Sequence, residues 1–161
     1  MPSRLRSSDP RASAEGGSSS ADELTVRADG EEVRRASSWL DAACRERGVP
    51  PALVDRLVLC LNEVLANVIV HGGAGALAQP IGLVLEVTAD PHGGLAGVTV
   101  SDAGVAFDPR SVAPRALPKS LEEASSGGLG LVMIRRHADW LEYRNQGGRN
   151  HVTFGARWKS P

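Results

Sequence analysis

One segment constrains the fold of this chain more than any other, the stretch between Pro51 and Gly73. Its large apolar side chains recur every three or four residues, which is the period of a helix with one buried face. They are Leu53, Leu57, Leu61, Val64 and Val68, with Val54, Val58 and Leu65 beside them. Pro51 suits the first turn of a helix, and the glycines at 72 and 73 end it. The sequence therefore predicts a long amphipathic helix with a wide apolar stripe.

Polar side chains interrupt one flank of this helix at regular spacing. Glu63, Asn67 and His71 recur every four residues, so successive members are ~40° apart around the axis. The flank borders the apolar stripe, where such groups should be partly buried and are costly without partners. An amide oxygen suits Mg²⁺, and Glu63 could polarise a hydroxyl or a water. Spacing alone leaves an ordinary helix with a few solvent-facing polar residues as an equal alternative.

The rest of the sequence predicts further helices and strands, with the strands mostly in consecutive pairs. Asp29 followed by acidic residues favours a helix start, and Gly48 and Pro50 favour its end. The expected elements, in order, are a strand over 23–28, a helix that begins after Asp29 and ends before Gly48, a helix over 51–71, strands over 83–87 and 98–102, a helix from 129, and strands over 140–144 and 151–158. Turns are expected at 91–94 and 147–148.

This order predicts an α+β fold, a two-layer α/β sandwich in which three helices cover one face of a mixed sheet. Residues 103–126 show no period, and a connection of that length is more often functional than accidental. Residues 1–20 are rich in Ser, Gly, Ala and Arg and are expected to be a disordered tail. Residues 21–161 are then one domain.

Composition and charge narrow the function classes. The net charge is −1, and nothing in the sequence suggests the basic face that nucleic-acid binding usually needs. No apolar run is long enough for a membrane helix, and no secretory signal is visible. Two cysteines, Cys44 and Cys60, make no disulfide framework and are interpreted as reduced helix residues. A cytoplasmic protein without nucleic-acid or membrane partners is expected.

A second candidate site follows the strand that ends at Asp102. A carboxylate at a strand end can accept the exocyclic amino group of adenine and repels the carbonyl of guanine. Gly104, two residues later, lets the backbone approach a flat base closely. The alternative is a strand that simply ends in a turn, since Asp and Gly are frequent turn residues.

A third candidate site is the run Ser125-Ser126-Gly127-Gly128-Leu129-Gly130-Leu131. Glycines just before a helix leave its first N–H groups free to bind an anion such as phosphate. The run matches neither a P-loop nor the fingerprint of dinucleotide-binding folds. By itself it is equally consistent with a flexible loop that starts a helix.

Together, and in this order, the three sites resemble the ATPase superfamily of gyrase B, the 90-class heat-shock chaperone, histidine kinases and MutL. Glu63 and Asn67 match its N-box, Asp102 and Gly104 its first glycine box, and the glycines at 127, 128 and 130 its second. Within it the chain is similar to the anti-sigma-factor serine kinases. The features behind this are Asn62 to Asn67 with His71-Gly72, Phe107-Asp108-Pro109 after Ala106, the Gly-Gly-Leu-Gly-Leu stretch, Ala138-Asp139, and 148–153.

The resemblance, over residues 22–158, implies that ATP lies between the helices and a lid over about 105–126. It implies that Glu63 is the catalytic base, Asn67 the Mg²⁺ ligand and Asp102 the reader of adenine. The other implied ATP-binding residues are His71, Gly104, Phe107, Gly127, Gly128, Leu129, Gly130 and Leu131. His71 either orients Glu63 or caps the helix end, and Lys119 either reaches the γ-phosphate or is solvated.

The resemblance also implies partners. Members of this family sequester a sigma factor and phosphorylate a serine on an anti-anti-sigma protein of the STAS type, and a homodimer is expected. Two alternatives stay open: a module that binds ATP and a partner without turnover, and a kinase of a protein unrelated to sigma factors. A histidine kinase is not indicated, because no separate dimerisation helix carries a phosphoacceptor His.

Overall fold

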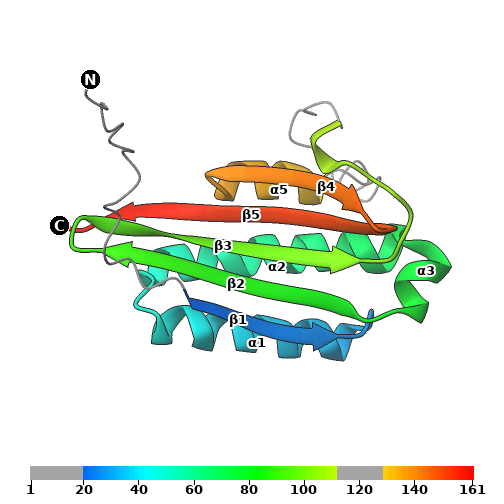
Figure 1. Cartoon of the computed structure of the whole chain (residues 1–161), viewed down its shortest axis with the longest axis horizontal. Helices are drawn as coiled ribbons and strands as arrows, with labels where there is room; N and C mark the ends of the chain where they lie inside the picture. The colour runs from blue at the N-terminus through cyan, green and yellow to red at the C-terminus, as the bar shows by residue number, and fades with distance from the viewer. Residues whose placement is uncertain (1–19, 112–128) are drawn as a thin grey trace, which may run out of the picture.

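The computed structural model describes residues 20–111 and 129–161 (Figure 1). The strands are β1 (Ser20–Val26), β2 (Ile81–Asp90), β3 (Gly93–Asp102), β4 (Trp140–Gln146) and β5 (Arg149–Lys159). The helices are α1 (Gly30–Glu46), α2 (Pro51–His71), α3 (Gly73–Ala78) and α5 (Leu129–His137), with a 3-10 turn, η1 (Pro109–Ser111). The predicted order of helices and strands is confirmed, with α3 and η1 added to it.

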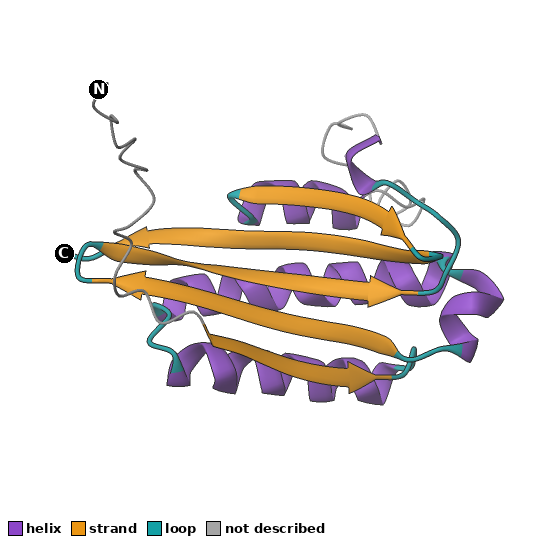
Figure 2. Cartoon of the chain, in the orientation of Figure 1, coloured by secondary structure: helices purple, strands orange, loops and turns teal. Residues whose placement is uncertain are grey.

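The sheet has five strands in the order β1-β2-β3-β5-β4, with β1 and β4 at its edges. Figure 2 shows α1, α2 and α5 behind the sheet, on one of its faces. The two-layer α+β architecture is therefore confirmed. The expectation of a mixed sheet is wrong in one respect, because all four strand pairings are antiparallel. Hairpin turns join β2 to β3 and β4 to β5, whereas other elements of the chain lie between the paired strands β1 and β2 and between β3 and β5.

The core lies between α2 and the inner face of the sheet. The apolar stripe of α2 is buried as predicted, with Leu57, Leu61 and Leu65 at most 1% exposed. The sheet meets it with alternate residues of its central strands, among them Leu83, Leu85, Val98, Val100 and Phe154. Burial of these side chains is the main driving force that holds the two layers together.

The helix cap and the tight turns that the sequence predicts are present in the structure. The Asp29 carboxylate accepts a hydrogen bond from the Glu32 N–H at 2.9 Å and so caps α1. Gly147 and Gly148 have φ angles of +62° and +73°, which non-glycine residues rarely adopt, and they join β4 to β5 in a two-residue turn. A second tight turn joins β2 to β3 at Pro91-His92.

The two short elements escape prediction for identifiable reasons. The sequence Gly-Ala-Gly-Ala-Leu-Ala of α3 carries little periodicity, and η1 is a single turn inside a segment without a pattern. Ser20, expected in the tail, already belongs to β1. The rest of the predicted tail, most of the predicted lid with Lys119, and Gly127 and Gly128 lie outside the described residues.

Both cysteines are free and buried, Cys44 on α1 and Cys60 on α2. In the part of the chain that the structure describes, no helix has the length and apolar character needed to cross a membrane.

Candidate nucleotide-binding site

A pocket opens where the C-terminal half of α2 meets α5, the end of β3 and the start of β5. It encloses about 490 Å³ of space between its lining atoms, part of which is open solvent. Its lining residues are Val64, Asn67, Val68, His71, Gly72, Asp102, Val105, Phe107, Pro109, Leu131, Ile134, Asn150 and Val152. The pocket thus brings together residues from all three of the candidate motifs.

The polar flank of α2 borders this pocket. Glu63 and Asn67 are half-buried, as expected, whereas His71 is exposed at the end of the helix. Within the described residues, the structure gives none of these three side chains a hydrogen-bond partner. Half-buried polar groups without partners are costly, and active sites are where proteins retain them. The expectation that all three are partly buried is wrong for His71, because α2 ends there.

The first turn of α5 packs directly on Glu63. A Cβ built on Gly130 would lie 2.6 Å from Glu63 Oε2 and 3.7 Å from Asn67 Oδ1. A Cβ here would make the end of the Glu63 side chain shift, and glycine lets the backbone of α5 lie this close to the carboxylate without that shift. The structure therefore joins Gly130 of the third motif to Glu63 and Asn67 of the first. Gly127 and Gly128, predicted to bind phosphate with them, lie outside the described residues.

Asp102 lies at the end of β3 and is 4% exposed. Its Oδ1 accepts hydrogen bonds from the Gly104 N–H at 2.8 Å and from Asn150 Nδ2 at 3.2 Å. In the described chain both bonds to this carboxylate fall on Oδ1. Oδ2 is therefore the oxygen available to a ligand in the pocket.

The structure shows a packing reason for glycine at position 104, in addition to the approach to a base that the sequence suggested. A Cβ at this position would lie 2.8 Å from the Cα and the carbonyl oxygen of Gly72. The neighbouring Val105 N–H donates to that same carbonyl at 3.0 Å. Gly104 thus lets the chain after β3 lie against the end of α2, whatever its distance from a bound base.

Asn150 lines the pocket, and although it lies in the 148–153 stretch that the family resemblance includes, the sequence assigned it no role. It is 4% exposed, and its Nδ2 donates to Asp102 Oδ1, Gly104 O and Val105 O at 3.2, 3.3 and 3.0 Å. Its Oδ1 accepts from the Tyr143 hydroxyl at 2.7 Å and from Asn145 Nδ2 at 3.1 Å. The available signal was an amide at an inward position of β5, in alternation with Val152 and Phe154.

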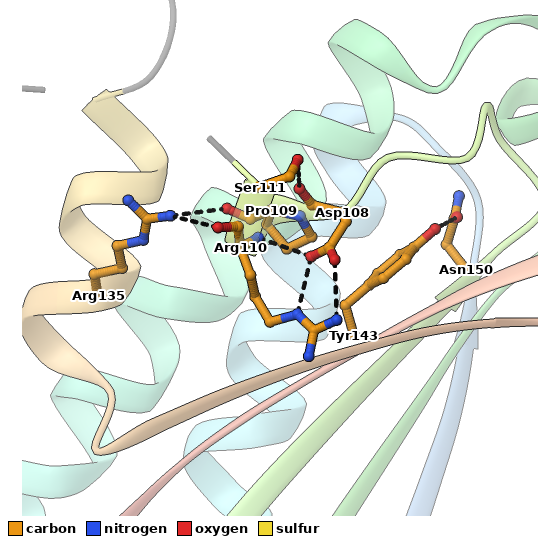
Figure 3. Close-up of polar contacts among 7 residues, drawn as sticks. All are labelled: Asp108, Pro109, Arg110, Ser111, Arg135, Tyr143 and Asn150. Atoms are coloured by element: carbon orange, nitrogen blue, oxygen red, sulfur yellow. Dashed lines mark hydrogen bonds and ion pairs between the residues drawn. The ribbon is translucent and has the colours of Figure 1, made fainter. Parts of the chain in front are cut away.

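The chain after Phe107 is held by a compact polar cluster (Figure 3). Asp108 accepts from the Arg110 backbone N–H at 2.8 Å and from its guanidinium at 3.0 and 2.9 Å. The Arg110 side chain thereby holds the pKa of Asp108 below its usual value. Arg135 of α5 donates from Nη2 to Pro109 O and Arg110 O at 3.2 and 3.3 Å.

This cluster fixes the position of two pocket residues. Phe107 precedes Asp108 and lines the pocket with its side chain 46% exposed, while Pro109 is buried. In the sequence, Phe107 is indicated by the family resemblance alone, and no motif includes Arg110 or Arg135. No spacing rule could have joined Arg135 to Pro109, since they lie 26 positions apart.

Comparisons with known proteins agree with this geometry. The sequence profile of the histidine kinase-like ATPase domain matches residues 26–155. The serine/threonine-protein kinase BtrW of Bordetella bronchiseptica is 31% identical over 138 residues, which cover 85% of this chain and 94% of BtrW.

Two solved structures share the fold at low sequence identity. The RsbU and RsbW domains of Rv1364c from Mycobacterium tuberculosis match with a TM-score of 0.62 and 18% identity, over 88% of this chain and 33% of that one. The SiaB–SiaC complex from Pseudomonas aeruginosa matches with a TM-score of 0.50 and 14% identity, over 84% of this chain and 89% of that one. The profile match and the identity to BtrW confirm the superfamily that the motifs predicted: this chain belongs to the histidine kinase-like ATPase domain family.

Proposed function

We propose that this protein is a kinase that transfers the γ-phosphoryl group of ATP to a serine or threonine hydroxyl of a partner protein. The observation that carries the proposal is the position of Glu63 and Asn67, side by side against the backbone of Gly130. Both side chains are half-buried and lack hydrogen-bond partners among the described residues. Identity of 31% to a serine/threonine-protein kinase supports the same reaction class.

In the proposed reaction the Glu63 carboxylate accepts the proton of the acceptor hydroxyl as its oxygen attacks the γ-phosphorus. The bond between that phosphorus and the bridging oxygen breaks, and ADP leaves with the electron pair. The N-terminal turn of α5 at Gly130 presents backbone N–H groups, which bind phosphate oxygens well. Leu129 and Leu131 would contribute backbone to this turn, and Gly127 and Gly128 would complete it. Phosphoryl transfer depends mainly on such positioning and charge stabilisation.

The residues present fit Mg²⁺ bound with the nucleotide. The Asn67 amide lines the pocket and has no hydrogen-bond partner in the described chain, so its oxygen is available to a hard cation. The described residues hold no cluster of three His, Cys, Asp or Glu side chains suited to a metal. A single protein ligand is sufficient where phosphates and waters supply the rest. When bound, Mg²⁺ supplies positive charge that neutralises the phosphate oxygens.

The adenine-reading role falls to Asp102. Its Oδ2 would accept the exocyclic amino group of adenine, while Oδ1 is held by Gly104 and Asn150. Phe107 and His71 border the same pocket and would contact the nucleotide, and Gly104 acts by shaping the backbone beside Asp102. ATP selectivity over GTP follows, because the guanine carbonyl faces the carboxylate.

Calorimetry of nucleotide binding tests the site. We expect ATP to bind in a Mg²⁺-dependent manner, GTP to bind far more weakly, and Asp102→Asn to weaken ATP binding by about 10–100-fold. Asp55→Asn is the matched control, because Asp55 is exposed on α2 and lies outside the pocket. A folded wild-type protein that binds no ATP at high micromolar concentration would overturn the proposed site.

The transfer step is tested with Glu63→Gln. Loss of the base should abolish phosphorylation while ATP affinity stays within a few-fold of wild type, since Glu63 acts on the acceptor hydroxyl. Glu31→Gln, an exposed carboxylate on α1, is the control for charge removal. A wild-type protein that binds ATP but phosphorylates no partner would leave an ATP-dependent binding module as the function.

We further propose that the substrate is a STAS-type anti-anti-sigma protein and that the second partner is a sigma factor, in a cytoplasmic partner-switching pathway with the kinase as a homodimer. The resemblance of the motif set to the anti-sigma-factor kinases supports this assignment. Incubation of the protein and ATP with STAS proteins of the same organism, followed by mass spectrometry, should identify one phosphoserine. Phosphorylation only of unrelated proteins would favour a kinase outside sigma regulation.

A further inference from the structure

The η1 turn connects the two halves of the pocket. On one side it continues from Phe107, which lines the pocket together with Asp102. On the other side it lies against α5, whose first turn packs on Glu63. Figure 3 shows Arg135 reaching from α5 to the backbone of this turn.

The internal bonds of η1 make the turn a rigid unit. The Ser111 N–H and hydroxyl both donate to Asp108 O, at 3.1 and 2.7 Å. The Asp108 carboxylate also accepts hydrogen bonds from the backbone N–H and the guanidinium of Arg110. Because the unit is closed on itself, its position relative to the helices is set by external bonds. Among the described residues, the hydrogen bonds from outside that reach η1 both come from Arg135.

We infer that Arg135 is a positioning residue for nucleotide binding, which ties the phosphate-binding helix α5 to the turn that places Phe107 and Pro109 against the base. The inference rests on the proposed function and goes beyond it, since Arg135 itself does not line the pocket. A single guanidinium nitrogen, Nη2, donates both hydrogen bonds, so the one nitrogen of a lysine ammonium can donate them as well. An uncharged short side chain cannot.

The effect on affinity should be independent of the phosphates. Arg135→Ala frees η1 and so disturbs the wall at the base, and we expect ATP and adenosine to bind about tenfold more weakly by the same factor. Arg135→Lys should recover most of the affinity for both ligands. Arg136→Ala is the matched control, because Arg136 is the exposed neighbour on the same helix.

Calorimetry of the full chain with ATP and with adenosine gives the decisive comparison. Equal weakening by Arg135→Ala, with Arg136→Ala within twofold of wild type, supports the inference. Weakening of ATP alone would overturn it, because Arg135 would then act on the phosphates, and unchanged binding of both ligands would overturn it as well. Asp108→Asn removes the ion pair with Arg110 inside the same turn and should also weaken the binding of both ligands by the same factor. This second variant provides the test if Arg135→Ala does not fold.

Hydrogen exchange separates this inference from the proposed function. In the nucleotide-free protein the amides of Arg110 and Ser111, which are hydrogen-bonded within η1, should exchange faster in Arg135→Ala than in Arg136→Ala. Equal rates in the two variants would refute the tie between α5 and η1. A wild-type protein that binds no nucleotide would refute the kinase site but would leave this exchange difference in place.

Discussion

Glycine 130 shows how much a single position can determine in this site. Most helical glycines are weak points, and replacing them with alanine stabilises a helix by about 0.5–1 kcal/mol. At Gly130 the added methyl group would lie 2.6 Å from Glu63 Oε2, which is far inside van der Waals contact. The reason for glycine at this position is therefore the neighbouring Glu63 carboxylate, in its present position, and not the backbone conformation of residue 130.

We predict that Gly130→Ala lowers thermal stability and ATP affinity, against the intrinsic helix preference of alanine. The methyl group forces either Glu63 or the first turn of α5 to move, and both belong to the proposed phosphoryl-transfer site. Gly30→Ala is the control, since Gly30 begins α1 and has open space around its Cβ position. Calorimetric titration and thermal denaturation measure both effects. A variant as stable and as active as wild type would contradict the packing of α5 on Glu63.

Asn150 is a buried polar residue whose amide group is fully hydrogen-bonded. It satisfies Asp102, Gly104 and Val105 on one side and is itself fixed by Tyr143 and Asn145 on the other. In the described chain no buried side-chain polar atom lacks a partner. Such fully satisfied networks specify one arrangement, here the one in which Asp102 Oδ1 makes the hydrogen bonds to Gly104 and Asn150.

Single helices and strands depend on a few terminal contacts. Helix α1 starts at the Asp29 cap, and its first turn carries Glu31 and Glu32, which favour the positive end of the helix dipole. Glu32 also accepts from the Arg27 N–H at 3.1 Å, closing the turn that follows β1. The cap therefore fixes both the start of α1 and the path of the chain from the edge strand.

We predict that Asp29→Ala destabilises the protein by ~1 kcal/mol, the usual cost of losing a helix cap, and lowers Tm by about 2–4 °C. Ser38→Ala is the control, because Ser38 is exposed on the same helix and its side chain makes no hydrogen bond within the described residues. Thermal denaturation followed by circular dichroism measures the difference. Equal Tm values for the two variants would mean that the Asp29 carboxylate contributes nothing to α1.

Asp139 joins three elements at the other end of the sheet. Its carboxylate accepts from the Arg157 N–H of β5 at 2.6 Å and pairs with Arg56 of α2 at 2.8 Å. The backbone bond from Arg157 first, and then the Arg56 side chain, hold its pKa below the ordinary carboxyl value. A carboxyl group with a lowered folded-state pKa adds stability above its unfolded pKa, and this stability is lost as the pH falls.

We predict that Asp139→Asn lowers Tm by about 2 °C at pH 7, a modest value because the side chain is 35% exposed and water screens the pair. The difference from wild type should shrink as the pH falls below ~4, the ordinary carboxyl pKa, where the unfolded chain begins to take up a proton that the native carboxylate takes up only at lower pH. Asp55→Asn, which removes an exposed carboxylate of α2, should show no such dependence. Denaturation curves from pH 7 to pH 3 measure this, and a constant difference would exclude the ion pair as its source.

At the scale of the whole molecule, one continuous core joins the helical layer to the sheet. Cys44 and Cys60 lie within it, and burial raises the pKa of Cys44 to about 12 and that of Cys60 to about 11. Thiols react as thiolates, so both cysteines should react only slowly at neutral pH while the core is intact. This agrees with their interpretation as reduced, structural residues.

We predict that both thiols stay unlabelled by a thiol-specific reagent in the native protein at pH 7 and react together on unfolding. The reason is that α1 and α2 share the core, so exposing either thiol requires opening both helices. Labelling rates followed by mass spectrometry across a urea series should give one transition for both residues. Rapid labelling of one cysteine in the folded protein would show that its helix opens independently.

The extent to which these features are visible in the sequence follows from the range of the forces involved. The α2 stripe, the Asp29 cap and the Gly147-Gly148 turn act over a few residues, so residue type and spacing alone predict them. The motifs at Glu63, Asp102 and Gly130 are recognisable as a set, although each is ambiguous alone. Residue type and spacing along the chain therefore determine the motif set and the two-layer architecture.

The tertiary structure decided what depends on residues far apart in the chain. The antiparallel register places Asn150 opposite Asp102, 48 positions earlier, and so brings the Asn150 amide within hydrogen-bond distance of the Asp102 carboxylate. The approach of Gly104 to Gly72, and of Arg135 to Pro109, likewise requires the helices to be packed on the sheet. A hydrogen bond requires its two atoms to lie about 3 Å apart, and a bond between residues distant in the chain leaves no pattern in the spacing of neighbouring residues. Such partners are therefore identified only in the folded chain.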